Sequence, residues 1–304
     1  MKEKEVGTNK YLGYLYAVLA TAIWSGNFIV ARGLHEVLPP VSLAFYRWTV
    51  ALVVVFPLAA RALYRERKVV QDNIGFLFLA SLFGVTIFNT LIYIAAQSTT
   101  AINLSLIAIT FPVFIIIFSR IFFAEAITMA KVSGIVVVSC GVVLLLTKGD
   151  ISQLSQISFA IGDFWMLIAA ITFAIYSVLL RKKPVGLGAL SFQLITFGLG
   201  IIMLAPFYIW EISSLPMPEI TLGTVGSIVY IGVFASLVAY VLWLKAIILI
   251  GPSHAGMIYY SLPLFCGILA YMMLDEEIGL IHLGATILII GGIVLANYKK
   301  QRTL

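Results

Sequence analysis

One arginine, Arg47, is the only charged residue that lies well inside an apolar stretch of this sequence. Ionisable side chains within such stretches are costly and usually serve a function. A guanidinium pairs bidentately with a carboxylate, so Arg47 is a candidate anchor for an acidic group of a substrate. The alternative is a structural arginine that reaches toward the outer surface or bonds carbonyls to lock its helix. The sequence leaves both interpretations open.

Two prolines, Pro112 and Pro263, fall near the middle of apolar stretches. A proline there kinks a helix and frees a backbone carbonyl, which lipid tolerates only where protein or water satisfies it. A hydroxyl precedes each proline by two residues, and another polar side chain lies seven residues before that hydroxyl. The prolines are expected hinges, and the polar residues before them are candidate substrate contacts. They are Asn103 and Thr110 before Pro112, and His254 and Ser261 before Pro263. The hydroxyls could instead bond their own helix, and His254 could be a solvated or capping residue.

Four further stretches carry polar and aromatic side chains at helical spacing. Polar groups of membrane helices face the interior, so these faces are expected to converge on one cavity. Aromatic rings with amide and hydroxyl groups suit a small amphipathic solute. The candidate cavity residues are Trp24, Asn27, Asn89, Tyr93, Tyr176 and Tyr240.

Membrane-spanning helices must position these residues. Of the 304 residues, 62% are hydrophobic and 11% are charged, against about 25% charged in an ordinary soluble domain. A span needs roughly 20 apolar residues, and continuous runs favour helices over barrel strands. Such runs cover about 11–32, 41–62, 74–95, 99–120, 131–147, 161–180, 188–210, 221–245, 252–274 and 280–298. The sequence predicts an all-α integral membrane protein with ten transmembrane helices in a lipid bilayer.

The basic residues are unevenly distributed among the loops. With the N-terminus inside, 16 of the 19 lysines and arginines lie on the cytoplasmic side, while Arg32 and Lys148 lie opposite and Arg47 lies within a span. This is the positive-inside bias, so both termini are expected in the cytoplasm. The net charge of +6 is therefore a signature of orientation, and no nucleic-acid partner is expected.

The sequence repeats at an offset of about 150 residues. The tripeptide that ends in Arg47 lies near the one that ends in Gln193, and the Pro112 segment matches the Pro263 segment. The predicted halves, 1–147 and 161–304, have five spans each and are joined by a linker at 148–160. An odd number of spans inserts the second half upside down. Inverted repeats of this kind recur in secondary transporters with a site at the membrane midplane.

All 13 acidic residues lie in loops, in termini or at helix ends. Proton-driven transporters usually place an Asp, Glu or His relay within their spans, so this placement favours facilitated diffusion or exchange. An enzyme would need convergent carboxylates, a metal site or a phosphate loop, and the loops are too short to hold one. Catalysis, a metal and a cofactor are therefore not expected.

Several segments resemble one known family. They are Ala22-Ile23-Trp24-Ser25, Phe45-Tyr46-Arg47, the two prolines followed by Glu125 and Glu276, and the glycine-rich fifth and tenth spans. With the five-plus-five arrangement, the chain resembles the drug/metabolite transporter superfamily and its EamA family of bacterial metabolite exporters. The resemblance implies that spans 1, 3, 4, 6, 8 and 9 surround a cavity, with spans 5 and 10 more peripheral. It also implies a small-molecule transporter of the bacterial inner (plasma) membrane that exports amino acids or related compounds by alternating access.

Other functions remain open at this point. A transporter of phosphorylated or sugar-linked anions would need at least two basic groups in the cavity, and only Arg47 qualifies. A membrane enzyme would show an acid–base or metal cluster, a lipid scramblase would show a polar groove facing lipid, and a structural anchor would not need polar faces. Gly134 with Gly141, and Gly284 with Gly291, predict close helix packing or a dimer face, so either a monomer or a homodimer is expected.

Overall fold

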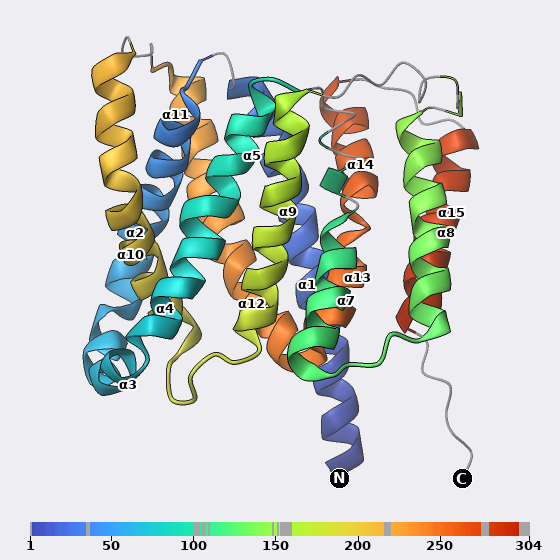
Figure 1. The fold of residues 1–304 in the computed structure, drawn as a ribbon, viewed down its shortest axis with the longest axis horizontal. Helices are drawn as coiled ribbons and strands as arrows, with labels where there is room; N and C mark the ends of the chain where they lie inside the picture. Colours follow the sequence, from blue (N-terminus) through green and yellow to red (C-terminus); the bar gives the residue numbers. More distant parts are fainter. Residues whose placement is uncertain are drawn as a thin grey trace.

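The computed structural model describes residues 2–34, 37–99, 104, 107–108, 110–147, 149–150, 152, 160–215, 220–274 and 280–297. These residues form helices without strands, which run side by side (Figure 1). The first half contains α1 (Lys2–Leu34), α2 (Pro40–Arg65), α3 (Arg67–Asp72), α4 (Ile74–Ser81), η1 (Leu82–Ile87), α5 (Phe88–Ala96), α7 (Thr110–Phe123) and α8 (Met129–Leu146). The second contains α9 (Ile161–Leu180), α10 (Ala189–Ser214), α11 (Leu222–Tyr230), η3 (Ile231–Val238), α12 (Ala239–Ile250), α13 (Pro252–Tyr259), α14 (Leu262–Leu274) and α15 (Leu280–Asn297).

The described helices are apolar and match the expected spans closely. Five helical stretches are long and apolar enough to cross a membrane, namely Pro40–Arg65, Ile74–Ala96, Ile161–Leu180, Ala189–Ser214 and Leu222–Ile250. Shorter apolar helices accompany them, and many large apolar side chains point outward. The chain is therefore an all-helical membrane protein. The count of ten spans stays a prediction, since part of the fourth expected span lies outside the described residues.

The antiparallel helices α2 and α10 cap each other at both ends. At one end, Glu211 of α10 accepts hydrogen bonds from the backbone N–H groups of Val41 (3.1 Å) and Ser42 (2.6 Å). At the other end, Glu66, which follows α2, accepts the backbone N–H of Gly188 (2.9 Å) just before α10. A carboxylate at a helix N-terminus satisfies free N–H groups and complements the helix dipole. The pair is thus fixed at both of its ends.

Two π-helical segments lie in the middle of long helical stretches. The segment η1 joins α4 to α5, and η3 joins α11 to α12. A π-helical turn leaves carbonyls without their usual helical partners, and such turns are common at functional sites. The sequence repeat makes these two segments equivalent, although nothing in the composition of either stretch predicts a π-helix.

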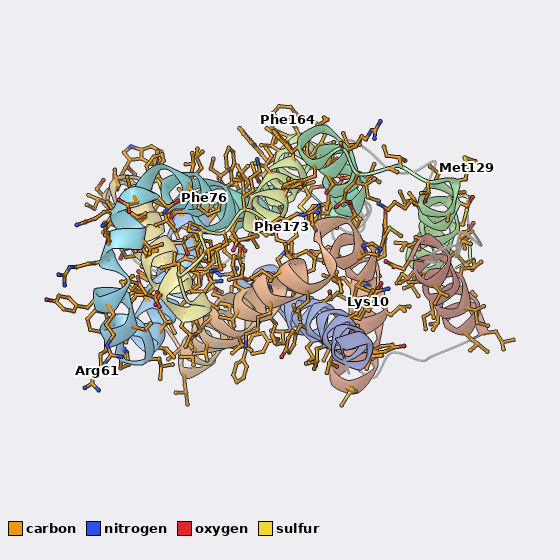
Figure 2. All side chains as sticks on the ribbon, turned by 90° about the horizontal axis from the view of Figure 1, so that it is seen from below. Lys10, Arg61, Phe76, Met129, Phe164 and Phe173 are labelled. Carbon is orange, nitrogen blue, oxygen red and sulfur yellow. The ribbon has the colours of Figure 1, made fainter. Side chains whose placement is uncertain are left out.

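The helices α8 and α15 pack against each other at one edge of the molecule (Figures 1 and 2). A Cβ atom on Gly134 or Gly141 would lie within 2.8 Å of atoms of α15, so both glycines permit close contact. Gly291, which was expected to do the same, has no heavy atom within 4 Å of its Cβ position. Its neighbour Gly292 faces α8 instead, where an added Cβ would lie 2.8 Å from the Gly134 carbonyl oxygen. The expected face was therefore wrong by one residue.

The chain also breaks near the second proline. A turn at Tyr260 and Ser261 separates α13 from α14, and Pro263 lies in the first turn of α14. Pro112 likewise lies in the first turn of α7. Proline is well accommodated there because the first N–H groups of a helix have no helical acceptor. Pro263 therefore begins a helical segment and does not lie at the centre of a continuous helix, whereas the chain just before Thr110 lies partly outside the described residues, so the prediction for Pro112 stays a prediction.

Candidate functional site

Arg47 lies at the centre of a buried polar cluster built from four helical stretches. Its Nε donates to Ser236 Oγ (2.7 Å), and its Nη1 donates to Asn89 Oδ1 (2.7 Å) and to the Tyr93 hydroxyl (2.7 Å). Asn27 Oδ1 lies 3.2 Å from both Nη1 and the Tyr93 hydroxyl. The cluster therefore joins α1, α2 and α5 of the first half to η3 of the second half.

Carbonyls of the π-helical segments complete this cluster. The Tyr240 hydroxyl accepts from Asn89 Nδ2 (2.8 Å) and donates to the carbonyl of Gly84 in η1 (2.7 Å). Trp24 Nε1 donates to the carbonyl of Ala235 in η3 (2.9 Å). Carbonyls that a regular α-helix would use internally are thus available to side chains from the opposite half.

The charge of Arg47 is not neutralised by any described acidic side chain. The ion pairs among the described residues lie at Glu125, outside this cluster. Arg47 is fully buried, and its Nη2 has no hydrogen-bond partner among the described residues. Its guanidinium carbon lies 4.8 Å from the ring centroid of Trp48, which provides a cation–π contact. A buried cation with a free donor is costly unless an anion approaches it, because low dielectric disfavours unpaired charge.

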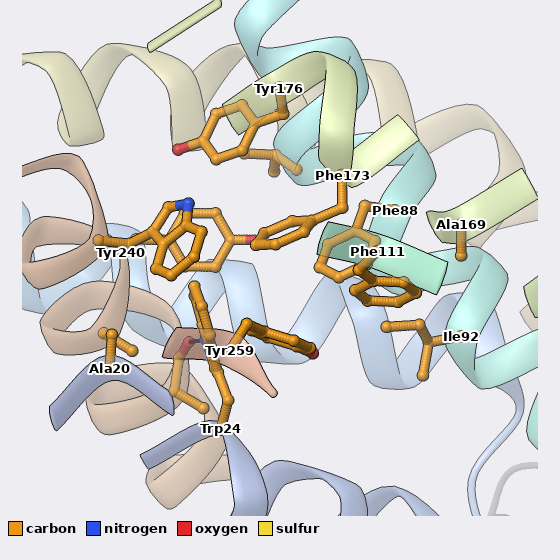
Figure 3. Packing of buried hydrophobic residues seen from close by; sticks show 14 of the residues in the cluster. Ala20, Trp24, Phe88, Ile92, Phe111, Ala169, Phe173, Tyr176, Tyr240 and Tyr259 are labelled. Carbon is orange, nitrogen blue, oxygen red and sulfur yellow. Dashed lines mark hydrogen bonds between the residues drawn. The ribbon is translucent and has the colours of Figure 1, made fainter. Parts of the chain in front are cut away.

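Aromatic rings pack beside the cluster (Figure 3). Trp24 contacts Phe173 (5.5 Å between ring centroids), Tyr240 (5.7 Å) and Tyr259 (6.0 Å). Phe173 also stacks on Phe88 at 4.5 Å. Figure 3 shows these rings converging from helices that are distant in the sequence. Their faces form an apolar wall beside Tyr240, whose hydroxyl bonds Asn89 of the cluster.

The structure brings together most of the residues expected to line a cavity. Those in the cluster or in contact with it are Trp24, Asn27, Arg47, Asn89, Tyr93, Tyr176 and Tyr240. Thr110 and Ser261 instead donate to the carbonyls of Ile107 (2.6 Å) and Ile258 (2.8 Å), so each bonds its own chain segment. His254 lies in a separate pocket beside Glu125, and Asn103 lies outside the described residues.

Two buried residues of this region escaped the sequence reasoning. Trp48 and Gln193 are fully buried, yet Trp48 Nε1 has no hydrogen-bond partner among the described residues, and the Gln193 amide adjoins the Tyr176 hydroxyl. The repeat alignment placed Gln193 near the counterpart of Arg47, which was the available signal. Trp48 directly follows Arg47, and nothing in the sequence distinguishes it from the apolar residues around it.

A second polar cluster lies at the opposite end of the molecule from the α1–α2 connection. Glu125, between α7 and α8, forms an ion pair with Arg181 at the end of α9 and accepts from Ser253 Oγ in α13 (2.5 Å). Lys131 Nζ lies 3.6 Å from the same carboxylate. A pocket of about 660 Å³ adjoins it, lined also by His254. The carboxylate thus joins the two halves of the chain.

The surroundings of Glu125 keep it ionised. Burial acts to raise the pKa of its carboxyl, but the hydrogen bond from Ser253 and the positive charges of Lys131, Arg181 and His254 outweigh this. The pKa therefore lies below its ordinary value.

Among the residues that the structure describes, no group of three His, Cys, Asp or Glu side chains could hold a metal ion.

The profile of the EamA-like transporter family matches residues 11–147 and 160–298. The chain belongs to this family. It is 29% identical over 296 residues to an uncharacterized transporter of Archaeoglobus fulgidus, with 95% of this chain and 98% of the relative covered. It is also 24% identical to the uncharacterized transporter YyaM of Bacillus subtilis, with 95% and 94% covered. A crystal structure of a protein with 19% identity matches 96% of each chain with a TM-score of 0.74, which shows a shared fold.

Proposed function

We propose that this membrane transporter moves a small carboxylate-bearing metabolite, an amino acid or a related compound, in the outward direction. The buried and unneutralised guanidinium of Arg47 is the observation that supports this cargo most directly. Its free Nη2 can donate a charge-assisted hydrogen bond to a carboxylate. The adjoining aromatic wall suits the apolar part of such a molecule.

The number of charges at the site favours a carboxylate over a phosphate. One guanidinium supplies one positive charge, and no second base lies in the described cluster. A phosphorylated or sugar-linked anion carries more charge and would leave part of it unpaired in a low-dielectric site. A purely cationic solute would be repelled by Arg47. A zwitterion or a monocarboxylate therefore fits best.

The closed geometry supports transport by alternating access at this central site. Arg47 and Tyr93 are inaccessible to solvent in this conformation, so a substrate reaches them only after helices separate. The Glu125 cluster links the α7–α8 connection to α9 and α13. Opening of this cluster would expose the Arg47 cluster to one side of the membrane. With the inverted repeat expected from the sequence, two halves would rock about the Arg47 cluster and expose it to each side in turn.

The positions of the described acids support exchange or facilitated diffusion. The buried carboxylates Glu211 and Asp163 lie in the last and first turns of their helices, where they accept backbone N–H groups. Neither is placed to relay protons through the centre. We place the protein in the bacterial inner (plasma) membrane as a multi-pass protein, with both termini cytoplasmic by the positive-inside bias.

Reconstituted vesicles test this function. Vesicles preloaded with one amino acid at a time from a panel are assayed for counterflow of the labelled compound, with and without a pH gradient. Counterflow of at least one amino acid that is unaffected by the gradient is expected. Counterflow of sugar phosphates alone would refute the cargo, and accumulation driven by the gradient would refute the exchange mechanism.

A further inference from the structure

A groove of about 450 Å³ lies between α2, α3 and α10, and none of its lining residues belongs to the Arg47 cluster. Most of it is lined by apolar side chains of the two long helices, namely Phe56, Ala60 and Leu63 from α2 and Leu194 and Ile195 from α10. Phe56 is 60% exposed. Both helices are long and apolar enough to cross a membrane, so the open side of the groove faces the acyl chains of the surrounding lipid.

Polar side chains lie at one end of this groove. Arg67 and Gln71 line it from α3, which lies at the lower end of α2 in Figure 1. The Arg67 guanidinium carbon is 4.6 Å from the ring centroid of Tyr64, which lines the groove from α2. Phe56 lies nine residues before Arg65, the last residue of α2, so the apolar part extends about 14 Å along the helix from this end. The groove thus combines a cationic end with an apolar length.

The positive charge at this end is available to a ligand. The ion pairs among the described residues involve Glu125, so Arg67 forms none with them. Glu66, beside Arg67 in the sequence, is engaged by the backbone N–H of Gly188 (2.9 Å). Residues 61–72 carry a net charge of +2, from four basic residues, Arg61, Arg65, Arg67 and Lys68, and two acidic residues, Glu66 and Asp72. Figure 2 shows Arg61 at the outer edge of the molecule.

This combination of charge and apolar surface matches a phospholipid. A guanidinium binds phosphate oxygens bidentately, and basic clusters beside a membrane helix attract anionic headgroups. A water-soluble anion would use only the charged end, and an acidic peptide would leave the membrane-facing length of the groove to lipid. A phospholipid fills both parts, because its phosphate and its acyl chains are joined in one molecule. The net positive charge favours an anionic headgroup over a zwitterionic one.

We propose that this groove binds one anionic phospholipid. Arg67 and Gln71 bind the phosphate, and an acyl chain lies along Phe56, Ala60 and Leu194. The hydrogen bond from Gly188 to Glu66 holds α10 against the end of α2, so the walls of the groove are in place before the lipid binds. The bound lipid contacts α2, α3 and α10 together and stabilises the folded protein, because it binds only where these helices are assembled.

Native mass spectrometry of the full chain in detergent tests this site. The protein is titrated with dioleoylphosphatidylglycerol or with dioleoylphosphatidylcholine, which has the same acyl chains and a zwitterionic headgroup. Arg67→Gln removes the charge that lines the groove. Lys68→Gln is the matched control, because it removes the same charge from the next residue, which is exposed and does not line the groove. Ala60→Phe, or Ala60→Leu if the first does not fold, fills the apolar part.

The expected result is saturable binding of one phosphatidylglycerol per chain, with a higher thermal midpoint when the lipid is bound. Loss of one surface charge weakens binding of an anionic lipid by about 5-fold wherever the charge lies, so Lys68→Gln should show that loss alone. Arg67→Gln should lose about 50-fold, because a charge-assisted hydrogen bond to the phosphate adds about 10-fold. The Ala60 variants should weaken binding of both lipids, because both carry the same acyl chains.

Three results would overturn the proposal. Equal losses in Arg67→Gln and Lys68→Gln would show that surface charge attracts the lipid without a site. Absence of any preference of the wild type for phosphatidylglycerol would refute an anionic ligand. Unchanged binding in a folded Ala60 variant would place the acyl chain elsewhere, and if neither Ala60 variant folds, the comparison of Arg67 with Lys68 decides alone. None of these outcomes bears on the cargo, because the groove shares no residue with the Arg47 cluster.

Discussion

Replacing Arg47 with glutamine separates binding from structural support. Glutamine places its Nε2 where arginine has Nε, so the hydrogen bond to Ser236 Oγ (2.7 Å) can persist. The two short bonds from Nη1 to Asn89 and Tyr93 are lost. Tyr93 keeps Asn27 as a partner, so only the Asn89 Oδ1 atom is left without a donor.

The cost of this change can be worked out from these contacts. One orphaned buried acceptor costs about 1–3 kcal/mol. Removal of an unneutralised buried charge offsets this, because desolvation of such a charge costs several kcal/mol. We therefore expect Arg47→Gln to fold, with a free energy of unfolding within about 3 kcal/mol of the wild type. Loss of two charge-assisted hydrogen bonds to a carboxylate, about 1.5 kcal/mol each, should weaken cargo binding by at least about 100-fold.

The assay combines thermal unfolding in detergent with counterflow in vesicles. Arg47→Lys is the matched variant, since it keeps the charge but loses the planar fork, and it should retain part of the binding. Unchanged carboxylate affinity in Arg47→Gln would refute the reasoning. So would a failure of both variants to yield folded protein, because Arg47 would then be a structural residue.

Three further changes have expected outcomes. Glu211→Gln should lower the free energy of unfolding by about 1–3 kcal/mol, measured by thermal denaturation, because an amide N–H would face the backbone donors at the start of α2. Gly84→Ala should destabilise the protein by about 1–3 kcal/mol, since its Cβ would lie 2.4 Å from the Tyr176 ring, whereas Gly226→Ala, with open space around it, should leave the midpoint nearly unchanged. Glu125→Gln should speed the reaction of a cysteine at the Arg181 end of α9 with a maleimide added from the side of the Glu125 cluster. Because the pKa of Glu125 is lowered from 4.5, its cluster is intact above that pH and is lost only as pH falls through the lowered pKa. The ratio of the variant's labelling rate to that of the wild type should therefore be constant between about pH 6 and pH 8, since the thiolate fraction of the cysteine affects both rates alike.

The sequence predicted the helical stretches and much of the polar cluster because these have local signals. Apolar runs identify spans whatever their neighbours, and polar residues at helical spacing identify an inward face. Asn89 and Tyr93 were recognised in this way, and both contact Arg47. The prediction that Thr110 and Ser261 contact substrate has no support in their hydrogen bonds, because each hydroxyl bonds a nearby carbonyl, the alternative that the sequence had left open.

Features that depend on contacts between the halves could not be predicted. The bond from Ser42 to Glu211 joins residues 169 positions apart, and no local pattern marks Glu211 as a cap for another helix. In each π-helical segment a backbone carbonyl accepts a hydrogen bond from a side chain of the other half, Gly84 from Tyr240 and Ala235 from Trp24. Gln193 lies in an apolar run, and a sequence does not show whether a buried amide has partners. The choice of Gly292 over Gly291 depends on how α15 is rotated against α8.

The capped pair of α2 and α10 bears on how the site could open. Arg47 lies about 10 Å along α2 from the end that Glu211 caps, at 1.5 Å per residue, and Gln193 lies in the first turns of α10 near the Glu66 cap. The carboxylates at both ends of the pair fix α2 against α10. The chain breaks at Tyr260 and Ser261 at one end of α13, and the Glu125 cluster holds the other end of α13 through Ser253. Since α2 and α10 belong to opposite halves, a rocking of the two halves would turn about this pair, and the Glu125 cluster at the α7–α8 connection would open.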